Sequence, residues 1–360
     1  KGVIMIPIFI ASVSPFSGKN LICLGLGLQF KRDGYKAGYF KPVGFSPVIV
    51  EGVTTDEDAV FLSRALEVNE PLQSICPVVL NDEIMGRLMG GEELNIRQKT
   101  LTAFNLASAG KDIMITRGLG RLSGGICLRF SELDFIKETH AKVIFVDKFQ
   151  SYIDTLDGFI HAAKILGDQL LGVVFNLIPS TKVSYIRELM VPFLKNNGIT
   201  TLGIIQKDRI LGAVPIREIV DTLTGKVLCC EDKADELIEH FMIGAMNVES
   251  ALNYFRKVSN KAVITGGDRS DIQLAALETP TKCLILTGGL YPNASILGRA
   301  QGIGVPIIVV RSDTATTLEA CENLSGFVSL HSKSKIQRAA EVVAREIDFK
   351  TLYAQLGLSK

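Results

Sequence analysis

The stretch of residues 4–24, IMIPIFIASVSPFSGKNLICL, constrains the fold more than any other part of this chain. Residues 4–10 form an apolar, partly β-branched run with the length of a buried strand, and small and turn residues follow up to Ser17. After Gly18 and Lys19, apolar residues recur with helical spacing. A strand, a small-residue loop, Gly-Lys and a helix stand in the order of a phosphate-binding loop.

Such a loop binds anions because backbone N–H groups at the start of the helix point at the phosphate. The helix dipole favours the negative charge, and the lysine adds a mobile cation. We therefore expect a phosphate group to be held by Ser14, Ser17, Gly18, Lys19 and Asn20.

The motif G-x-x-x-x-G-K-[ST] is imperfect in this chain. Val13 stands where the motif has Gly, and Asn20 stands where it has the Ser or Thr whose hydroxyl binds Mg²⁺. Val resists the positive φ that Gly adopts at little cost. A Gly-Lys pair that starts a helix by chance is the alternative, and the loop could also bind a nucleotide without turning it over.

Composition narrows the class of protein. The 360 residues suggest two or three domains, and 47% hydrophobic with 21% charged residues indicates large buried cores. The net charge of +1 provides no field of one sign for nucleic acid or an anionic membrane. Seven Cys without a C-x-x-C motif predict buried thiols in a reducing cytoplasm. The apolar N-terminal run is too short for a membrane span or a signal peptide.

Strands and helices alternate along the first part of the chain. We expect a doubly wound, mostly parallel α/β domain over residues 1–230, because most of its strands are largely apolar. Residues 72–80 are read as extended. Residues 232–257 read as a long, partly amphipathic helix, so 231–260 is the expected helical connector between domains.

A smaller α/β domain is expected over residues 261–360, with a strand at 327–330 and a helix at 334–347. Three of its strands are followed by polar or glycine-rich loops, at the edge where open α/β sheets bind ligands. The candidate ligand contacts are Asp268, Arg269, Thr287, Gly288 and Asp313. The alternative is that these residues only form tight turns and helix N-caps.

The motifs carry a resemblance to known families. The first domain resembles the dethiobiotin-synthetase and cobyrinate-amidase branch of P-loop proteins, through SVSPFSGKN, YFKPVG, TTDEDA, the glycine loop RGLGRLSGG and FNLIP. The second is similar to the DRTGG domain, through TGGDRSDIQLAAL and LILTGGLYPN. Together they resemble the N-terminal region of long phosphate acetyltransferases. We expect a free-standing copy of that region, so acetyl transfer is not implied.

The resemblance implies roles for five residues. Gly18 and Lys19 match the phosphate cradle, and Lys41 matches a lysine that faces substrate and phosphate. Asp58 matches an acidic Mg²⁺ ligand, and Asn176 matches the Asn that reads the adenine edge.

Arg117 departs from the related enzymes, which carry the Glu of a V-E-G sequence at this position as a second Mg²⁺ ligand. Hard cations prefer oxygen ligands, and a guanidinium nearby opposes them and can pair with phosphate itself. We therefore expect ATP or another nucleotide, or a simpler anion, to bind with little or no Mg²⁺ and little hydrolysis. The alternative is that Arg117 points away and pairs with Asp58 or Glu57.

Three functions remain open. The first is a nucleotide- or anion-responsive regulatory protein that is read by a protein partner and forms a homo-oligomer. The second is an ATP-dependent ligase or amidase of the synthetase type, with Lys19 and Lys41 handling a phosphorylated carboxylate. The third is a structural or assembly subunit related to phosphate acetyltransferase.

Overall fold

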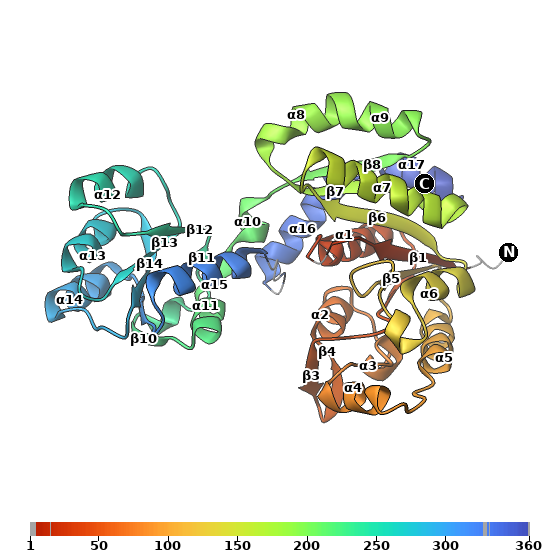
Figure 1. Ribbon diagram of the computed structural model, residues 1–360, viewed down its shortest axis with the longest axis horizontal. Coiled ribbons are helices and arrows are strands. Elements are labelled where there is room, and N and C mark those ends of the chain that lie inside the picture. The colour runs from red at the N-terminus through yellow and green to blue at the C-terminus, as the bar shows by residue number, and fades with distance from the viewer. Residues whose placement is uncertain (1–4, 15, 327–329, 331, 359–360) are drawn as a thin grey trace. The chain divides into compact units, whose positions relative to one another are not determined.

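The chain forms two compact units in the computed structural model, which describes residues 5–14, 16–326, 330 and 332–358 (Figure 1). Unit 1 comprises Lys1–Lys207 and Leu330–Lys360, and unit 2 comprises Asp208–Ser329. The C-terminal segment therefore belongs to unit 1, whereas the sequence suggested that it completes the second domain.

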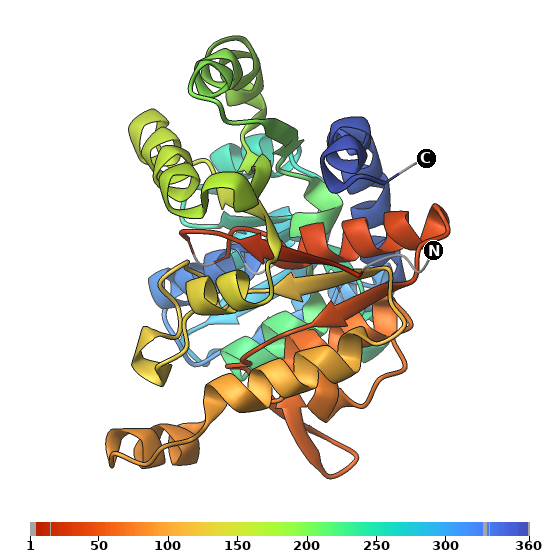
Figure 2. The same cartoon turned by 90° about the vertical axis from the view of Figure 1, so that its right-hand side faces the viewer.

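Unit 1 is built on a six-stranded sheet in which every neighbouring pair is parallel. The strand order is β2-β5-β1-β6-β7-β8, so the loop after β1 leaves from the middle of the sheet. Helices cover both faces (Figure 2), as the predicted doubly wound fold requires. The strands are β1 (Ile6–Ala11), β2 (Ala37–Phe40), β5 (Ile113–Arg117), β6 (Lys142–Lys148), β7 (Leu170–Ile178) and β8 (Thr201–Gln206).

The helices of unit 1 follow the apolar periodicity of the sequence. The longer ones are α1 (Lys19–Arg32), α2 (Glu57–Ala65), α5 (Ile96–Ser108), α7 (Tyr152–Leu166) and α16 (Lys333–Glu346). The shorter ones are α3 (Leu72–Ile75), α4 (Asp82–Met89), α6 (Glu132–Glu138), α8 (Val183–Tyr185), α9 (Val191–Asn196) and α17 (Phe349–Leu356). A π-helical segment, Ile186–Met190, joins α8 to α9. The expected extended segment at residues 72–80 is wrong, because α3 occupies its first half.

A hairpin follows β2 that the sequence did not predict. Strands β3 (Pro47–Val50) and β4 (Val53–Asp56) pair antiparallel. Asp56 then caps α2, because its side chain accepts from the backbone N–H groups of Asp58 and Ala59. The hairpin therefore positions the acidic segment that the sequence analysis singled out.

Helix α1 packs against three segments that lie far from it in the sequence: α16, Leu66 at the end of α2, and α17. A Cβ on Gly25 would lie 2.3 Å from Val343 of α16, and one on Gly27 would lie 2.6 Å from Leu66. The two glycines therefore permit close helix packing. The ring of Tyr353 in α17 stacks on Phe30 of α1 at a centroid distance of 5.8 Å. These contacts explain why the C-terminal helices belong to unit 1.

Unit 2 contains a five-stranded sheet with the order β10-β15-β14-β13-β12. The pairs among β12 to β15 are parallel, and β10 is antiparallel to β15. Its strands are β10 (Lys226–Cys229), β12 (His240–Ile243), β13 (Lys261–Gly266), β14 (Thr281–Thr287) and β15 (Ile307–Val309). Strands β9 (Val214–Pro215) and β11 (Leu237–Ile238) form a separate pair. The helices are α10 (Arg209–Gly212), α11 (Ile216–Leu223), α12 (Val248–Phe255), α13 (Ser270–Leu277), α14 (Ala294–Ile303) and α15 (Thr314–Gly326).

The helical connector expected over residues 231–260 is wrong. This segment contains a 3₁₀ turn at Glu231–Lys233, the strands β11 and β12, and α12, which has only eight residues. The apolar spacing of Met242, Met246 and Phe255 suggested a helix, yet Met242 lies in β12, which pairs with β13. The strand expected at residues 327–330 falls largely outside the described residues. Within the described ranges, no helix combines the length and the apolar character that crossing a membrane requires.

Candidate phosphate-binding site

The loop between β1 and α1 presents the start of a helix without a side-chain cap. Gly18 occupies the N-cap position with φ +88°, so the N-cap residue provides no side-chain hydrogen bond to the first turn of the helix. A left-handed φ is costly for residues with a Cβ, so glycine suits this position. Uncapped N–H groups at a helix start favour an anion. The local geometry is that of the predicted phosphate loop.

Lys19 is folded into this loop and is almost fully buried. Its Nζ donates to Ser12 Oγ at 2.7 Å and lies 3.5 Å from Ser17 Oγ. Burial, helped by the positive charge of Arg117 and opposed by Glu132, lowers the pKa of Lys19 to about 8. The ammonium group is thus mostly charged at neutral pH.

Side chains from the neighbouring strands β6 and β7 stabilise the loop through Ser14 and Ser17. Ser14 Oγ donates to Asp147 Oδ2 at 3.3 Å and accepts from Gln150 Nε2 at 2.6 Å. Asn176 Nδ2 donates to the Ser17 carbonyl at 2.8 Å, and its Oδ1 is buried without a hydrogen-bond partner among the described residues. The Asn176 side chain is fully buried. In this arrangement it braces the loop rather than presenting an edge to a nucleobase.

A Cβ at position 18 would lie 1.9 Å from Asn176 Nδ2. The glycine is therefore required twice: for its left-handed φ and for the close approach of Asn176.

Asp58 is surrounded by nitrogen donors. Its Oδ1 accepts from Asn20 Nδ2 at 2.6 Å, and its Oδ2 accepts from Lys41 Nζ at 2.8 Å. Arg117 Nη1 lies 2.9 Å from the same Oδ2 as an ion pair, although its angle is not that of a hydrogen bond. Burial would raise the pKa of Asp58, but Arg117, Lys41 and Asn20 hold it well below its usual range. The sequence left open whether Arg117 pairs with a phosphate or with Asp58 or Glu57. In the structure Arg117 pairs with Asp58.

Lys41 also pairs with Asp56, and both side chains are fully buried. Asp56 was not singled out in the sequence analysis, because it reads as the ordinary N-cap of α2. The exposed ring of Phe45 covers the cations, with its centroid 4.8 Å from Lys41 Nζ and 5.7 Å from Arg117 Cζ. We call Asn20, Lys41, Asp56, Asp58 and Arg117 the Asp58 cluster.

The Asp58 cluster does not fit Mg²⁺. This ion requires near-octahedral oxygen ligands, whereas both oxygens of Asp58 already face nitrogen donors, two of them cationic. Asn20 Oδ1, which has no hydrogen-bond partner within the described part of the chain, is a single neutral oxygen beside these cations. Over the described ranges, no group of three His, Cys, Asp or Glu side chains is arranged to hold a metal.

Glu132 is a buried acid that sequence reasoning missed. It follows the N-cap Ser131 of α6, where acidic residues are common at the surface. Here it is almost fully buried and accepts from the Gly120 N–H at 2.9 Å. Burial raises its pKa to about 7, against the hydrogen bond from Gly120 and the charge of Lys19. Nothing in the local sequence distinguishes it from an ordinary first-turn acid.

The three predicted loops of unit 2 do meet at one edge. Thr287 and Thr314 share a hydrogen bond of 3.0 Å, and the Gly288 N–H donates to the Ser312 carbonyl at 2.9 Å. Asp313 caps α15 by accepting from the N–H groups of Ala315 and Thr316.

Arg269 forms two hydrogen bonds with Asp271, both 3.0 Å long. Together with the caps and loop contacts, this arrangement satisfies most polar groups of the edge internally, as the turn-and-cap alternative describes.

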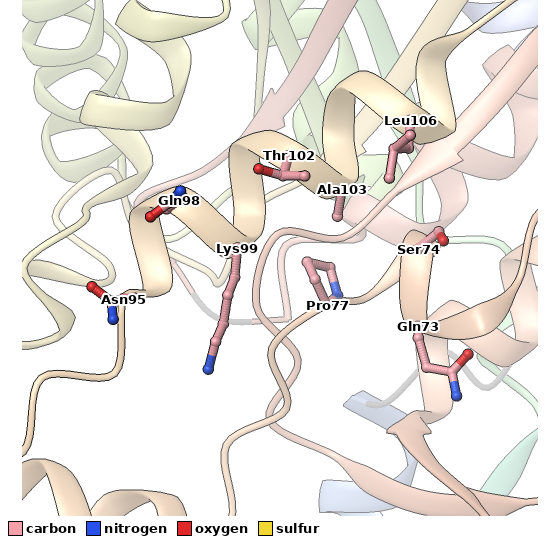
Figure 3. Close-up of a pocket in the computed structure, with 9 residues that line it drawn as sticks. All are labelled: Gln73, Ser74, Pro77, Asn95, Gln98, Lys99, Thr102, Ala103 and Leu106. Carbon is pink, nitrogen blue, oxygen red and sulfur yellow. The ribbon is translucent and has the colours of Figure 1, made fainter.

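A groove of about 510 Å³ lies elsewhere on unit 1, between α3 and α5 (Figure 3). None of the residues predicted for the site lines it. Its lining consists of Gln73, Ser74, Pro77, Asn95, Gln98, Lys99, Thr102, Ala103 and Leu106. Because the groove is open and its polar side chains lie near the surface, it does not replace the phosphate loop as the candidate site.

Comparison with known families decides the class of the chain. A family model described as AAA domain matches residues 7–221, which is more than half of the sequence. The chain belongs to this family. A second model, the DRTGG domain, matches residues 218–324. The AAA domain contains the phosphate loop and the Asp58 cluster, and the predicted combination of a P-loop domain with a DRTGG domain is confirmed.

Two kinds of curated relative are similar to this AAA-domain chain. Phosphate acetyltransferase of Pseudomonas putida is 25% identical over 97% of the chain and 52% of its own length. The enzyme of Nitratidesulfovibrio vulgaris is 24% identical over 97% and 51%. The chain thus spans about half the length of these relatives. ATP-dependent dethiobiotin synthetase of Methanococcus vannielii is 24% identical over 55% of the chain and 92% of its own length.

Among solved structures, the MinD cell division protein of Aquifex aeolicus matches at 14% identity with a TM-score of 0.34, over 57% of this chain and 84% of that one. The CBS and DRTGG domains of Clostridium perfringens pyrophosphatase, complexed with diadenosine tetraphosphate, match at 19% identity with a TM-score of 0.29, over 46% and 74%.

Proposed function

We propose that unit 1 binds a phosphate-bearing anion, a nucleotide or a simpler phosphate, at the loop before α1 without Mg²⁺. The observation that carries the proposal is the pairing of Asp58 with Lys41 and Arg117 beside an uncapped helix start. Fixed cations take the place of a metal, and Lys19 with the loop amides supplies the anion contacts.

The role that fits this site is regulatory. Phosphoryl transfer relies on a positioned metal and charge stabilisation, and the Asp58 cluster provides no metal ligand set. The ligand state would be read by unit 2 or by a protein partner, and a homo-oligomer is part of the proposal. Acetyl transfer is not proposed, because the similarity covers only half of the acetyltransferases.

The test is ligand binding by calorimetry and thermal shift with ATP, ADP, pyrophosphate and inorganic phosphate, each in Mg²⁺ and in EDTA. Ligand at 100 times its Kd should stabilise the protein by about 2.7 kcal/mol, equally in both conditions. Lys19→Met should abolish the effect. Lys99→Met, at an exposed lysine of the groove in Figure 3, is the matched control and should leave it unchanged. Absence of stabilisation by every anion would remove the proposal.

An ATP-dependent ligase of the dethiobiotin synthetase type is the second candidate. It is favoured by the match to that enzyme over 92% of its length and by two lysines, 19 and 41, near the phosphate loop. This function requires Mg²⁺-dependent ADP release with a carboxylate substrate. The double substitution Asn20→Thr with Arg117→Glu restores the usual metal ligands. If only the double variant turns over ATP, the natural chain is not such an enzyme.

A further inference from the structure

Glu132 is enclosed by the second glycine loop, residues 117–125. A Cβ on Gly118 would lie 2.4 Å from Glu132 Oε2, and one on Gly124 would lie 3.2 Å from Oε1. Oε1 accepts from the Gly120 N–H, and Oε2 is buried with no hydrogen-bond partner among the described residues. The chain thus closes glycines around a carboxyl group and leaves one of its oxygens unsatisfied. A buried charge in this state is expensive.

Hydrogen bonds through Ser12 and Gly120 connect this carboxyl group with the phosphate loop. Lys19 Nζ donates to Ser12 Oγ at 2.7 Å, and the single Ser12 hydroxyl proton has two acceptors within reach, the Gly120 carbonyl at 2.8 Å and the Ser14 carbonyl of the phosphate loop at 2.9 Å. The N–H of the same Gly120 bonds Glu132. All the groups are buried or half-buried. A change at Lys19 therefore reaches Glu132 through one residue of the second glycine loop.

The charges that act on Glu132 come from two other elements, Lys19 of α1 and Arg117 of β5. Backbone hydrogen bonds from Gly120 and Leu119 also lower the pKa of Glu132. The small cavity beside the carboxyl group is lined mainly by apolar residues, Phe9, Pro42, Val43, Leu119, Phe130 and Phe135, together with Gly118 and Ser131.

Burial and the two cations act in opposite directions, so the carboxyl group is divided between its neutral and charged forms near pH 7. An added negative charge at Lys19 shifts this balance toward the neutral form.

We propose that Glu132 takes up a proton from solvent when an anion binds at Lys19. The carboxylate and one proton become a neutral carboxyl group, and no covalent bond changes. This proposal rests on the function proposed above. Because anion binding is coupled to the uptake of a proton by Glu132, the affinity for the anion should fall as the pH rises through about 7. The second glycine loop, which contacts Glu132 through Gly120, is then the segment whose interactions change when an anion binds.

The experiment uses the full chain with sulfate, a phosphate-like anion that does not titrate near neutral pH. Infrared difference spectra at pH 7.5, with and without sulfate, should show carboxylate bands replaced by the carbonyl stretch of a protonated carboxyl group. Glu132→Gln should bind sulfate without this band. Lys19 gives no carbonyl band, so its own titration does not interfere. Glu138→Gln, at the far end of α6 in an exposed ion pair with Arg97, is the matched control and should keep the band.

Calorimetry in two buffers of different ionisation enthalpy provides the second measurement. Lys19 takes up protons on sulfate binding in both proteins, so the wild type should take up more protons per bound sulfate near pH 7 than Glu132→Gln, by up to about half a proton. Sulfate binding by the wild type without a new carboxyl band, or with the same band in Glu132→Gln, overturns this inference and leaves the anion site intact. If neither sulfate nor any of the phosphate ligands binds, the proposed function fails and this inference with it.

Discussion

Each unit of this molecule contains a glycine loop with a buried polar side chain beneath it. In unit 1, Glu132 accepts from Gly120 N–H. In unit 2, Gln273 donates to the carbonyls of Gly266 and Gly267 at 2.9 and 3.0 Å. Both side chains have one buried oxygen that lacks a hydrogen-bond partner among the described residues. The packing is similar, but only the acid of unit 1 can change its charge.

The charged side chains near the two loops differ in their burial. Unit 1 places fully buried charges beside its loop, Lys41 with Asp56, and an almost fully buried Lys19. At the corresponding edge of unit 2, Arg269 and Asp313 are partly or fully exposed and are engaged in local turns and caps. Polar loops at the carboxyl ends of parallel strands are thus not sufficient evidence for a site. Buried and incompletely satisfied groups are the stronger signal.

The largest difference is expected when one partner of an ion pair is removed. Lys41→Met leaves Asp56 buried without its cation, and it should destabilise unit 1 by about 3–5 kcal/mol. Arg269→Met breaks an exposed pair and should cost less than about 1 kcal/mol. Urea unfolding midpoints measure both. Equal costs would mean that the Asp58 cluster is solvated like the surface of unit 2.

Two glycines with positive φ provide the second comparison. Gly18→Ala brings a Cβ within 1.9 Å of Asn176 and should lower the stability of unit 1 by about 2–4 kcal/mol. The same substitution should abolish anion binding. Gly288 has a similar φ, +78°, but its nearest atom is 3.9 Å away. Gly288→Ala should therefore cost only about 1–2 kcal/mol, from the backbone conformation alone. Thermal unfolding measures both losses of stability. If Gly18→Ala and Gly288→Ala lose similar stability and Gly18→Ala still binds the anion, the phosphate loop is not tightly packed around Gly18.

Exchanging the two buried side chains tests the role of charge directly. The pKa of Glu132 is 4.5 in the unfolded chain and about 7 when folded, so the folded state binds more protons between these values. Stability then falls as the pH rises from 4.5 to 7, and the penalty is complete above 7.

Glu132→Gln removes this penalty and should stabilise unit 1 by about 3 kcal/mol at pH 8, with little gain near pH 5. Gln273→Glu should destabilise unit 2, more at pH 8 than at pH 5, because it buries a new carboxylate and loses two N–H donors. The measurement is the unfolding midpoint of both variants and of the wild type as a function of pH. A Glu132→Gln variant with the same pH profile as the wild type would show that Glu132 stays charged.

The local pattern of the sequence was sufficient for most of the fold. The apolar run before Gly18 and the helical spacing after it predicted β1 and α1, and alternating strands and helices predicted the parallel sheet of unit 1. Local patterns failed where tertiary pairing decides the structure. Strand β12 exists through its pairing with β13, and α16 joins unit 1 because Gly25 leaves room for Val343.

The candidate site was predictable to a similar extent. The loop pattern singled out Lys19, and the resemblance to the synthetases singled out Lys41, Asp58 and Arg117. The structure brings the last three of these together. The burial of Glu132 was not predictable, because it depends on Gly118 and Gly124 closing over the side chain from another part of the chain. The bracing role of Asn176 likewise requires the position of the Ser17 carbonyl.

The smallest effect is expected at Asp313, the clearest cap of the unit 2 edge. Asp313→Ala removes its hydrogen bonds to the N–H groups of Ala315 and Thr316 and should cost about 1 kcal/mol in thermal unfolding. Since the carboxylate is fully committed to α15 and is not buried, nucleotide and phosphate binding by the whole chain should be unchanged. A loss of ATP or phosphate affinity in this variant, measured by calorimetry, would place a ligand at the unit 2 edge. Burial of the charged groups would then not distinguish the ligand-binding loop of unit 1 from the loops of unit 2.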